Sequence, residues 1–219
     1  MTAKARYDAL SSDRSQFLNI AEQATKLTLP YLVRGEEEHN GGARNLTTPW
    51  QSVGAKGVVT LASKLMLALL PPQTSFFKLQ LDENALQGQV PPEMRSELDL
   101  SFAKIERTIL EAIAASSDRV IVHQALKHLI VAGNVLVFMG ESGLKMFPLN
   151  RYVLERDGNG NVIEIVTKER INKSLLEDIV PEDFMLDQEQ DVNEDGEYVD
   201  RQEIDIYTHC IRAVSYTHL

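Results

Sequence analysis

The spacing of apolar residues changes near residue 135, and this change constrains the fold more than any other feature of the sequence. Upstream of it, apolar residues recur at intervals of three and four; downstream, they alternate in short runs between Gly- and Asp-rich turns. Helices followed by antiparallel hairpins are typical of an α+β chain. We therefore expect a helical part over residues 7–133 and a β-rich part over residues 134–212.

Four stretches of the first part have helical spacing. The first pattern ends at Pro30, and its stripe comprises Tyr7, Leu10, Phe17, Ile20, Ala24 and Leu27. The third has the stripe Met94, Leu98, Phe102, Ile105, Ile109 and Ile113. The fourth has Asp118 as its expected cap, the stripe Val122, Leu126, Leu129 and Ala132, and Gly133-Asn134 as its stop.

The second stretch, residues 49–70, is apolar around most of its circumference. Thr48 and Gln51 form a capping box with Pro49 at the first helical position, which predicts a helix from there to about Leu70. A helix of this kind must be covered on several sides. Either the core of the same domain or a second subunit could cover it. Because Lys56 and Lys64 interrupt its apolar stretch, we do not expect it to span a membrane.

Short alternating runs predict the strands. One strand is expected at 77–81, one hairpin at 135–139 and 144–149, and a second at 151–156 and 161–171. A short acidic helix is expected at 173–180, and a last strand at 203–211.

The charge is distributed unevenly along the chain. Residues 1–150 hold 15 basic and 15 acidic residues, whereas residues 151–219 hold 7 and 17, so the net charge of −10 belongs to the last third. A surface that binds nucleic acid tightly needs clustered Lys and Arg, and no such cluster occurs. The acidic third is read as a solvated acidic face, or alternatively as a surface that repels nucleic acid.

No motif predicts a catalytic, cofactor-binding or metal site. His123 and His128 are five apart and do not share a helix face, and the neighbours His209 and Cys210 point to opposite faces of a strand. The turn at 140–145 lacks the spacing of a phosphate-binding loop. We therefore expect a protein that is not an enzyme and needs no cofactor. The alternative is a hydrolase or transferase whose active site is assembled from residues far apart in the sequence.

One acidic loop resembles a calcium-binding loop. Asp191, Asn193 and Asp195 occupy ligand positions 1, 3 and 5, and Gly196 follows at position 6. Position 12 is Gln202, where calcium needs a bidentate Glu. An acidic turn is the favoured interpretation, and a calcium-dependent adaptor or binding module is the alternative function.

Three separated blocks carry a resemblance to a known family. The residues TPWQSVGAKGVVTLASKLMLALLPPQTSFFKL (48–79), LKHLIVAGNVLVFM (126–139) and RYVLERDGNGNVIEIVTKERI (151–171) occur in this order. They resemble the N-terminal region of the portal, or head–tail connector, proteins of short-tailed podoviruses of the Autographivirus type. The departures lie in the loops at 34–44, 82–93 and 181–202.

The resemblance implies a structural subunit of a ring, usually of twelve copies, at one capsid vertex of the virion. Its expected partners are further copies of itself, terminase, scaffold, capsid and tail proteins, with double-stranded DNA passing through the ring without tight binding. The chain would supply the helical and β-rich parts of the wing region, without the stem, clip and crown. The host cytoplasm is the implied place of assembly.

The last seven residues, AVSYTHL (213–219), are a separate expectation. They look like the translation of an adapter sequence used in preparing sequencing libraries. Protein sequence would then stop near Arg212; an ordinary strand tail is the alternative.

Overall fold

The computed structural model describes residues 2–33, 48–72, 74–81, 92–141, 143–172 and 203–212. Five helices and two antiparallel sheets follow one another in these ranges, which confirms the α+β class. The chain forms two compact units, one of residues 1–16 with 150–219 and the other of residues 17–149. We call them the sheet unit and the helical unit.

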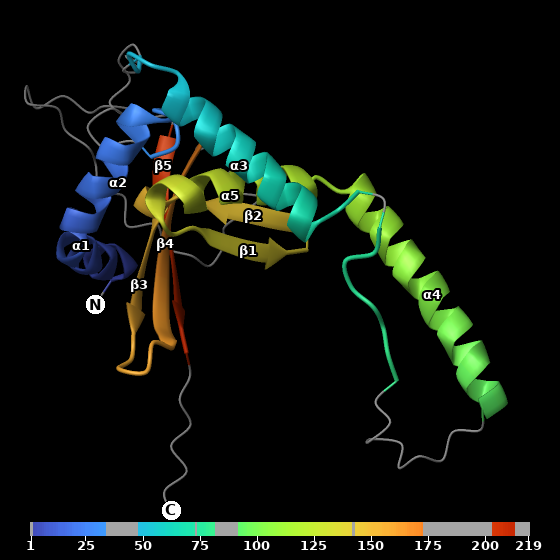
Figure 1. Ribbon diagram of the computed structural model, residues 1–219. Coiled ribbons are helices and arrows are strands. Elements are labelled where there is room, and N and C mark those ends of the chain that lie inside the picture. Colours follow the sequence, from blue (N-terminus) through green and yellow to red (C-terminus); the bar gives the residue numbers. More distant parts are fainter. Residues whose placement is uncertain are drawn as a thin grey trace, which may run out of the picture. The chain divides into compact units, whose positions relative to one another are not determined.

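The sheet unit packs one helix on a three-stranded sheet (Figure 1). Its elements are α1 (Ala3–Asp13), β3 (Tyr152–Arg156), β4 (Val162–Asn172) and β5 (Glu203–Ile211). The order is β3-β4-β5, antiparallel throughout, with β4 in the centre. Tyr7 of α1 packs on Val153 and Val166, which are fully buried. The predicted hairpin of 151–156 and 161–171 is confirmed, and the packing of α1 on it brings residues about 150 positions apart into one core.

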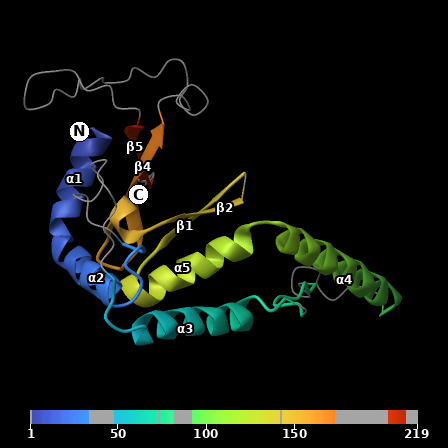
Figure 2. The same cartoon turned by 90° about the horizontal axis from the view of Figure 1, so that it is seen from above.

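The helical unit pairs two helices and carries a hairpin and a further long helix (Figures 1 and 2). Its elements are α2 (Ser15–Leu27, most of which belongs here), α3 (Val53–Leu69), α4 (Pro92–Ala115), α5 (Asp118–Ala132), β1 (Leu136–Gly140) and β2 (Gly143–Phe147). The 3-10 helix η2 (Leu149–Arg151) follows. α3 lies alongside α5, with Ala62, Met66 and Leu126 buried between them.

Two glycines allow close or unusual backbone geometry in the helical unit. A Cβ on Gly54 would lie 2.6 Å from the carbonyl oxygen of Leu27, so the start of α3 can pass the end of α2 only without a side chain there. Gly133 ends α5 with φ 72°, a left-handed conformation that favours glycine. The predicted stop of this helix is thus confirmed.

The N-terminal helix prediction is wrong in one respect. Residues 7–27 belong to two helices, α1 and α2, separated at Arg14. The predicted stripe does not continue into α2, because Phe17, Ile20 and Leu27 are 70%, 58% and 74% exposed. α2 instead buries the smaller Ala21 and Thr25, whose hydroxyl donates to the carbonyl of Val33.

The predicted caps of α3 and α5 are also wrong. α3 begins at Val53 rather than Pro49, and its N-cap Ser52 makes no side-chain hydrogen bond. In α5 the N-cap is Ser117, while the carboxylate of Asp118 accepts from the Leu144 N–H at 2.9 Å. Asp118 therefore attaches the β1–β2 hairpin to α5 rather than capping the helix.

Residues 77–81 do not form the predicted strand, since this segment has no partner strand among the described residues. Its Leu79 N–H donates to the Glu106 carboxylate of α4 at 2.6 Å, so a helix side chain replaces a neighbouring strand. The predicted helix at 173–180, the calcium-like loop at 191–202 and the tail at 213–219 lie outside the described residues. In the described ranges, no helix is long and apolar enough to cross a membrane.

Candidate functional surfaces

A charged cluster fixes α1 to the sheet. The guanidinium of Arg6 donates from Nε to the Glu164 carboxylate at 2.5 Å and also pairs with Glu155. The other oxygen of Glu164 lies 2.8 Å from Nε2 of His209 on β5. One helix residue is therefore held by two neighbouring strands, and the third strand supports the same carboxylate.

Glu164 remains ionised within this cluster. The hydrogen bond from Arg6 is the main cause that lowers its pKa to about 2; burial opposes this shift and the hydrogen bond with His209 supports it. Only 9% of its side chain is exposed. A carboxylate with so low a pKa holds no proton near neutral pH, so its chemistry here is anchoring rather than acid–base catalysis.

A second set of contacts surrounds Lys168 of β4. Its ammonium lies 5.9 Å from the ring centre of Tyr7 and 5.8 Å from that of Tyr207, and 3.4 Å from the Asp205 carboxylate. The two tyrosine rings meet edge to face at 5.4 Å. The Tyr7 hydroxyl donates to the carbonyl of Asn150 at 2.9 Å. These contacts position α1 and leave the sheet unit closed on that side.

His123, His128, His209 and Cys210 are not brought together into one site. Nε2 of His123 lies 3.5 Å from the Ser63 hydroxyl, and His128 is 5% exposed. Burial, with Lys127 nearby, lowers the pKa of both. His209 faces Glu164 while Cys210 is exposed, as the strand geometry predicts. Within the part of the chain that the structure describes, no three His, Cys, Asp or Glu residues are grouped to hold a metal.

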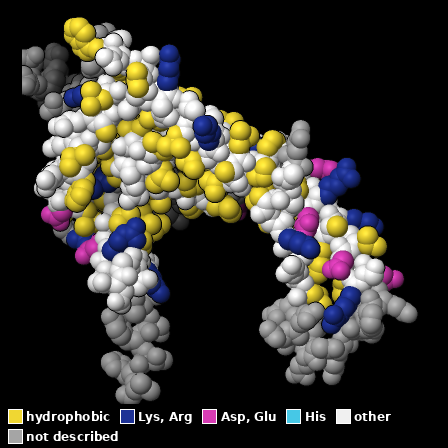
Figure 3. Space-filling model, in the orientation of Figure 1, with side chains coloured by type: hydrophobic (Ala, Val, Ile, Leu, Met, Phe, Trp, Pro, Cys, Tyr) yellow, Lys and Arg dark blue, Asp and Glu magenta, His cyan; other side chains and the backbone are white. Residues whose placement is uncertain are grey.

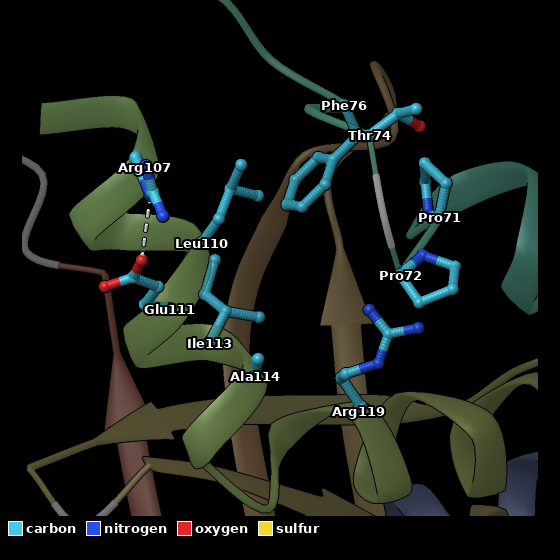
Figure 4. Close-up of a pocket in the computed structure, with 10 residues that line it drawn as sticks. All are labelled: Pro71, Pro72, Thr74, Phe76, Arg107, Leu110, Glu111, Ile113, Ala114 and Arg119. Carbon is cyan, nitrogen blue, oxygen red and sulfur yellow. Dashed lines mark hydrogen bonds and ion pairs between the residues drawn. The ribbon is translucent and has the colours of Figure 1, made fainter. Parts of the chain in front are cut away.

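A pocket of about 210 Å³ lies between α4 and the segment that follows α3 (Figure 4). Leu110 and Ile113 of α4 form one wall and face Phe76, while Arg119 of α5 lies near Pro72. The Arg119 guanidinium donates to the Leu70 carbonyl at 2.7 Å. The pocket is therefore lined by apolar side chains and by the Arg119 guanidinium, which is already bound to a backbone carbonyl. Such a lining suits the packing of protein segments against each other.

The outward face of α3 is exposed in this structure. Its members share helical spacing and are Val53, Lys56, Thr60, Lys64 and Leu67, which we call the α3 outer face. Val53 and Leu67 are 72% and 60% exposed. Figure 3 shows hydrophobic side chains along this helix, with Lys side chains among them. The core of the helical unit therefore covers only one side of α3. A second subunit, the other possibility raised by the sequence, is not needed for that side.

The helix α4 has an exposed apolar stripe as well. It comprises Met94, Leu98, Ile105 and Ile109, which we call the α4 stripe. Met94, Ile105 and Ile109 are 53%, 47% and 37% exposed. On β1, Phe138 and Met139 are 57% and 79% exposed. The helical unit therefore presents several apolar surfaces, which mark interaction sites more often than scattered single residues do.

The sequence analysis missed the charged cluster around Glu164. Its members lie in three separate parts of the chain, and only the strand register brings them together. The one local signal was the alternation of Glu164, Lys168 and Arg170 on one face of β4, which marks a face that is polar although buried beneath a helix.

Comparisons with known proteins agree over almost the whole chain. Residues 1–218 match the model of a family described as bacteriophage head to tail connecting protein. The portal protein of Enterobacteria phage T3 is 39% identical over 213 residues, and that of Escherichia phage T7 is 36% identical over 214 residues. Each alignment covers 94% of this chain but 38% of the relative. The portal protein of Pseudomonas phage phiKMV is 27% identical over 214 residues.

Proposed function

Because this chain belongs to the family of bacteriophage head-to-tail connecting proteins, we propose that the full-length protein is a structural subunit of a phage portal ring. The ring occupies one capsid vertex, joins head to tail and conducts double-stranded DNA during packaging and ejection. The match over residues 1–218 carries this proposal. Since the chain spans about 38% of the length of its T3 and T7 relatives, it contributes part of such a subunit.

The surfaces of the helical unit support assembly into a ring. A subunit that is surrounded by copies of itself needs apolar faces that its own core does not cover, and α3 and α4 provide them. The charge supports passage of DNA without tight binding, because residues 1–150 have no net charge and the rest carries −10. Further partners of the proposed ring are terminase, scaffold, capsid and tail proteins, and its assembly takes place in the host cytoplasm.

Electron microscopy of the purified full-length gene product tests the proposal. Negatively stained particles should be closed rings with a central channel, of twelve copies if the family pattern holds. A phage that lacks this gene should make heads without packaged DNA, and a plasmid copy should restore packaging. Monomers only, together with normal packaging in the mutant phage, would reject the proposed function.

The calcium-dependent alternative remains a prediction from the sequence at Asp191–Gln202. Calorimetric titration of the chain with calcium would test it. Binding in the micromolar range that is lost in an Asp191→Asn, Asp195→Asn variant would revive it, and no heat change would remove it.

A further inference from the structure

We propose that the α4 stripe of one copy packs on the α3 outer face of the neighbouring copy. This inference rests on the proposed function, because it assigns the two sides of a contact between ring subunits. A head-to-tail contact of this kind uses two different surfaces of the same chain, and it closes into a ring when the rotation between copies allows it.

The first observation is that α4 has little cover of its own. It runs from Pro92 to Ala115, and no side chain that the structure describes on it is buried. Figures 1 and 2 show it extending from the start of α5, away from the α3–α5 pair. The segment at 74–81 covers one side, through the bond between Leu79 and Glu106, but Ile105 and Ile109 remain exposed. A lone helix gains little stability in water, so an apolar stripe on it calls for a partner.

The second observation is that α3 offers an exposed side that is apolar at both ends and carries Lys56 and Lys64 between them. Its outer face is regular, with Val53 and Leu67 at the ends and Thr60 between them. The buried residues Val58, Ala62 and Met66 lie on the opposite side and already pack in the helical unit. The exposed side can therefore receive a second helix without disturbing the first contact.

The third observation is charge complementarity. α3 has two charged residues, Lys56 and Lys64, and both lie on the outer face. The sequence of α4 has five acidic and three basic residues, so the helix carries a net charge of −2, and Glu97 lies beside the stripe. Figure 3 shows acidic side chains on α4 and none along α3 in that view. Two copies of α3 would repel each other, whereas α3 against α4 pairs opposite charges.

Copies of the same chain are thus the occupant that these helices fit. Both surfaces belong to the helical unit, so each copy carries both sides of the proposed contact. A dimer in which α4 meets α4 would leave the lysines of α3 unpaired.

Site-directed cross-linking of the full-length protein tests this arrangement. In a background whose cysteines, including Cys210, are replaced by serine, Thr60→Cys and Ile105→Cys are combined and treated with a short bismaleimide. We expect a ladder of cross-linked multimers on a denaturing gel. The matched control combines Thr60→Cys with Leu100→Cys, which is 63% exposed but lies on the other side of α4, and it should lose the ladder.

Mixing the single variants separates contacts between copies from contacts within one. Thr60→Cys and Ile105→Cys proteins should cross-link after co-assembly, and neither should cross-link alone. Microscopy of the same samples reports ring formation independently. Rings without a Thr60–Ile105 ladder, or a product that forms only within one chain, would overturn the α3–α4 contact and leave the portal function standing. Absence of rings in the wild-type protein would instead count against the portal function itself.

Discussion

The two units of this chain solve the problem of covering apolar surface in different ways. The sheet unit covers one face of its sheet with its own helix: α1 lies on that face, and Tyr7, Val153 and Val166 are almost completely buried. The helical unit buries one side of α3 against α5 and leaves the other side exposed. This difference means that the core of the sheet unit is formed by contacts within the chain, whereas one side of α3 in the helical unit is free of such contacts among the described residues.

The largest expected effect tests the closed side of this comparison. Tyr7→Ala removes an aromatic ring that is 3% exposed, and the chain should lose about 3–5 kcal/mol of unfolding free energy. Phe17→Ala, at 70% exposure on the next helix, should change it by less than about 0.5 kcal/mol. Urea unfolding followed by circular dichroism measures both. Equal losses would mean that α1 and α2 are covered alike, contrary to the structure.

A smaller effect separates the two sides of α3. Met66→Ala empties a buried position against α5 and should cost about 2–3 kcal/mol. The adjacent Leu67→Ala, which is 60% exposed, should cost less than about 0.5 kcal/mol in the same unfolding measurement. Sedimentation of the full-length protein should show the reverse order for assembly, with Leu67→Ala impairing ring formation more. If Leu67→Ala destabilised the chain as much as Met66→Ala, the outer face would not be free.

The charged cluster predicts a pH effect that belongs to the sheet unit. The pKa of Glu164 falls from 4.5 to about 2 on folding, so its stabilisation is present above pH 4.5 and is lost as the pH falls through the folded pKa. Glu164→Gln should cost about 1–2 kcal/mol at pH 7 through its weakened bond to Arg6. Between pH 4.5 and 2 its unfolding free energy should fall less steeply than that of the wild type.

Hydrogen exchange locates that effect. Amides of α1 and β4 should lose protection in acid, while those of α3 and α5 should be affected less, because Glu164 lies in the sheet unit. Parallel pH profiles for the wild type and Glu164→Gln would contradict the assigned pKa.

The sequence predicted local elements better than it predicted their contacts. The hairpins at 136–147 and 152–172 follow from alternation and turn residues, which are local properties. The cap at Thr48 failed because a capping box is a weak local preference, and α3 begins at Val53 with Ser52 as its N-cap instead. The Phe17 stripe failed since periodicity shows which residues share a face, but not whether anything covers it.

The candidate surfaces could be anticipated only in part. The apolar circumference of residues 49–70 predicted a helix covered on several sides, by the domain core or by a second subunit, and the structure leaves one side of it exposed. The Arg6–Glu164–His209 cluster could not be found, because it depends on the register of β4 with β5 and on the return of the N-terminal helix to the sheet.

The smallest effect on stability is expected at β1, the most exposed strand of the helical unit. Val137, Phe138 and Met139 are exposed in succession, so both faces of an edge strand are apolar, a pattern that promotes unwanted pairing between chains. Met139→Lys should change the unfolding free energy by less than about 0.5 kcal/mol, because that side chain is 79% exposed. It should nevertheless slow the aggregation of the isolated chain, measured by light scattering, since a charge on an edge strand opposes pairing.

Lys145→Arg on β2 keeps the charge and serves as the matched control. Unchanged aggregation in Met139→Lys would place the self-association of the chain on α3 and α4 rather than on this strand.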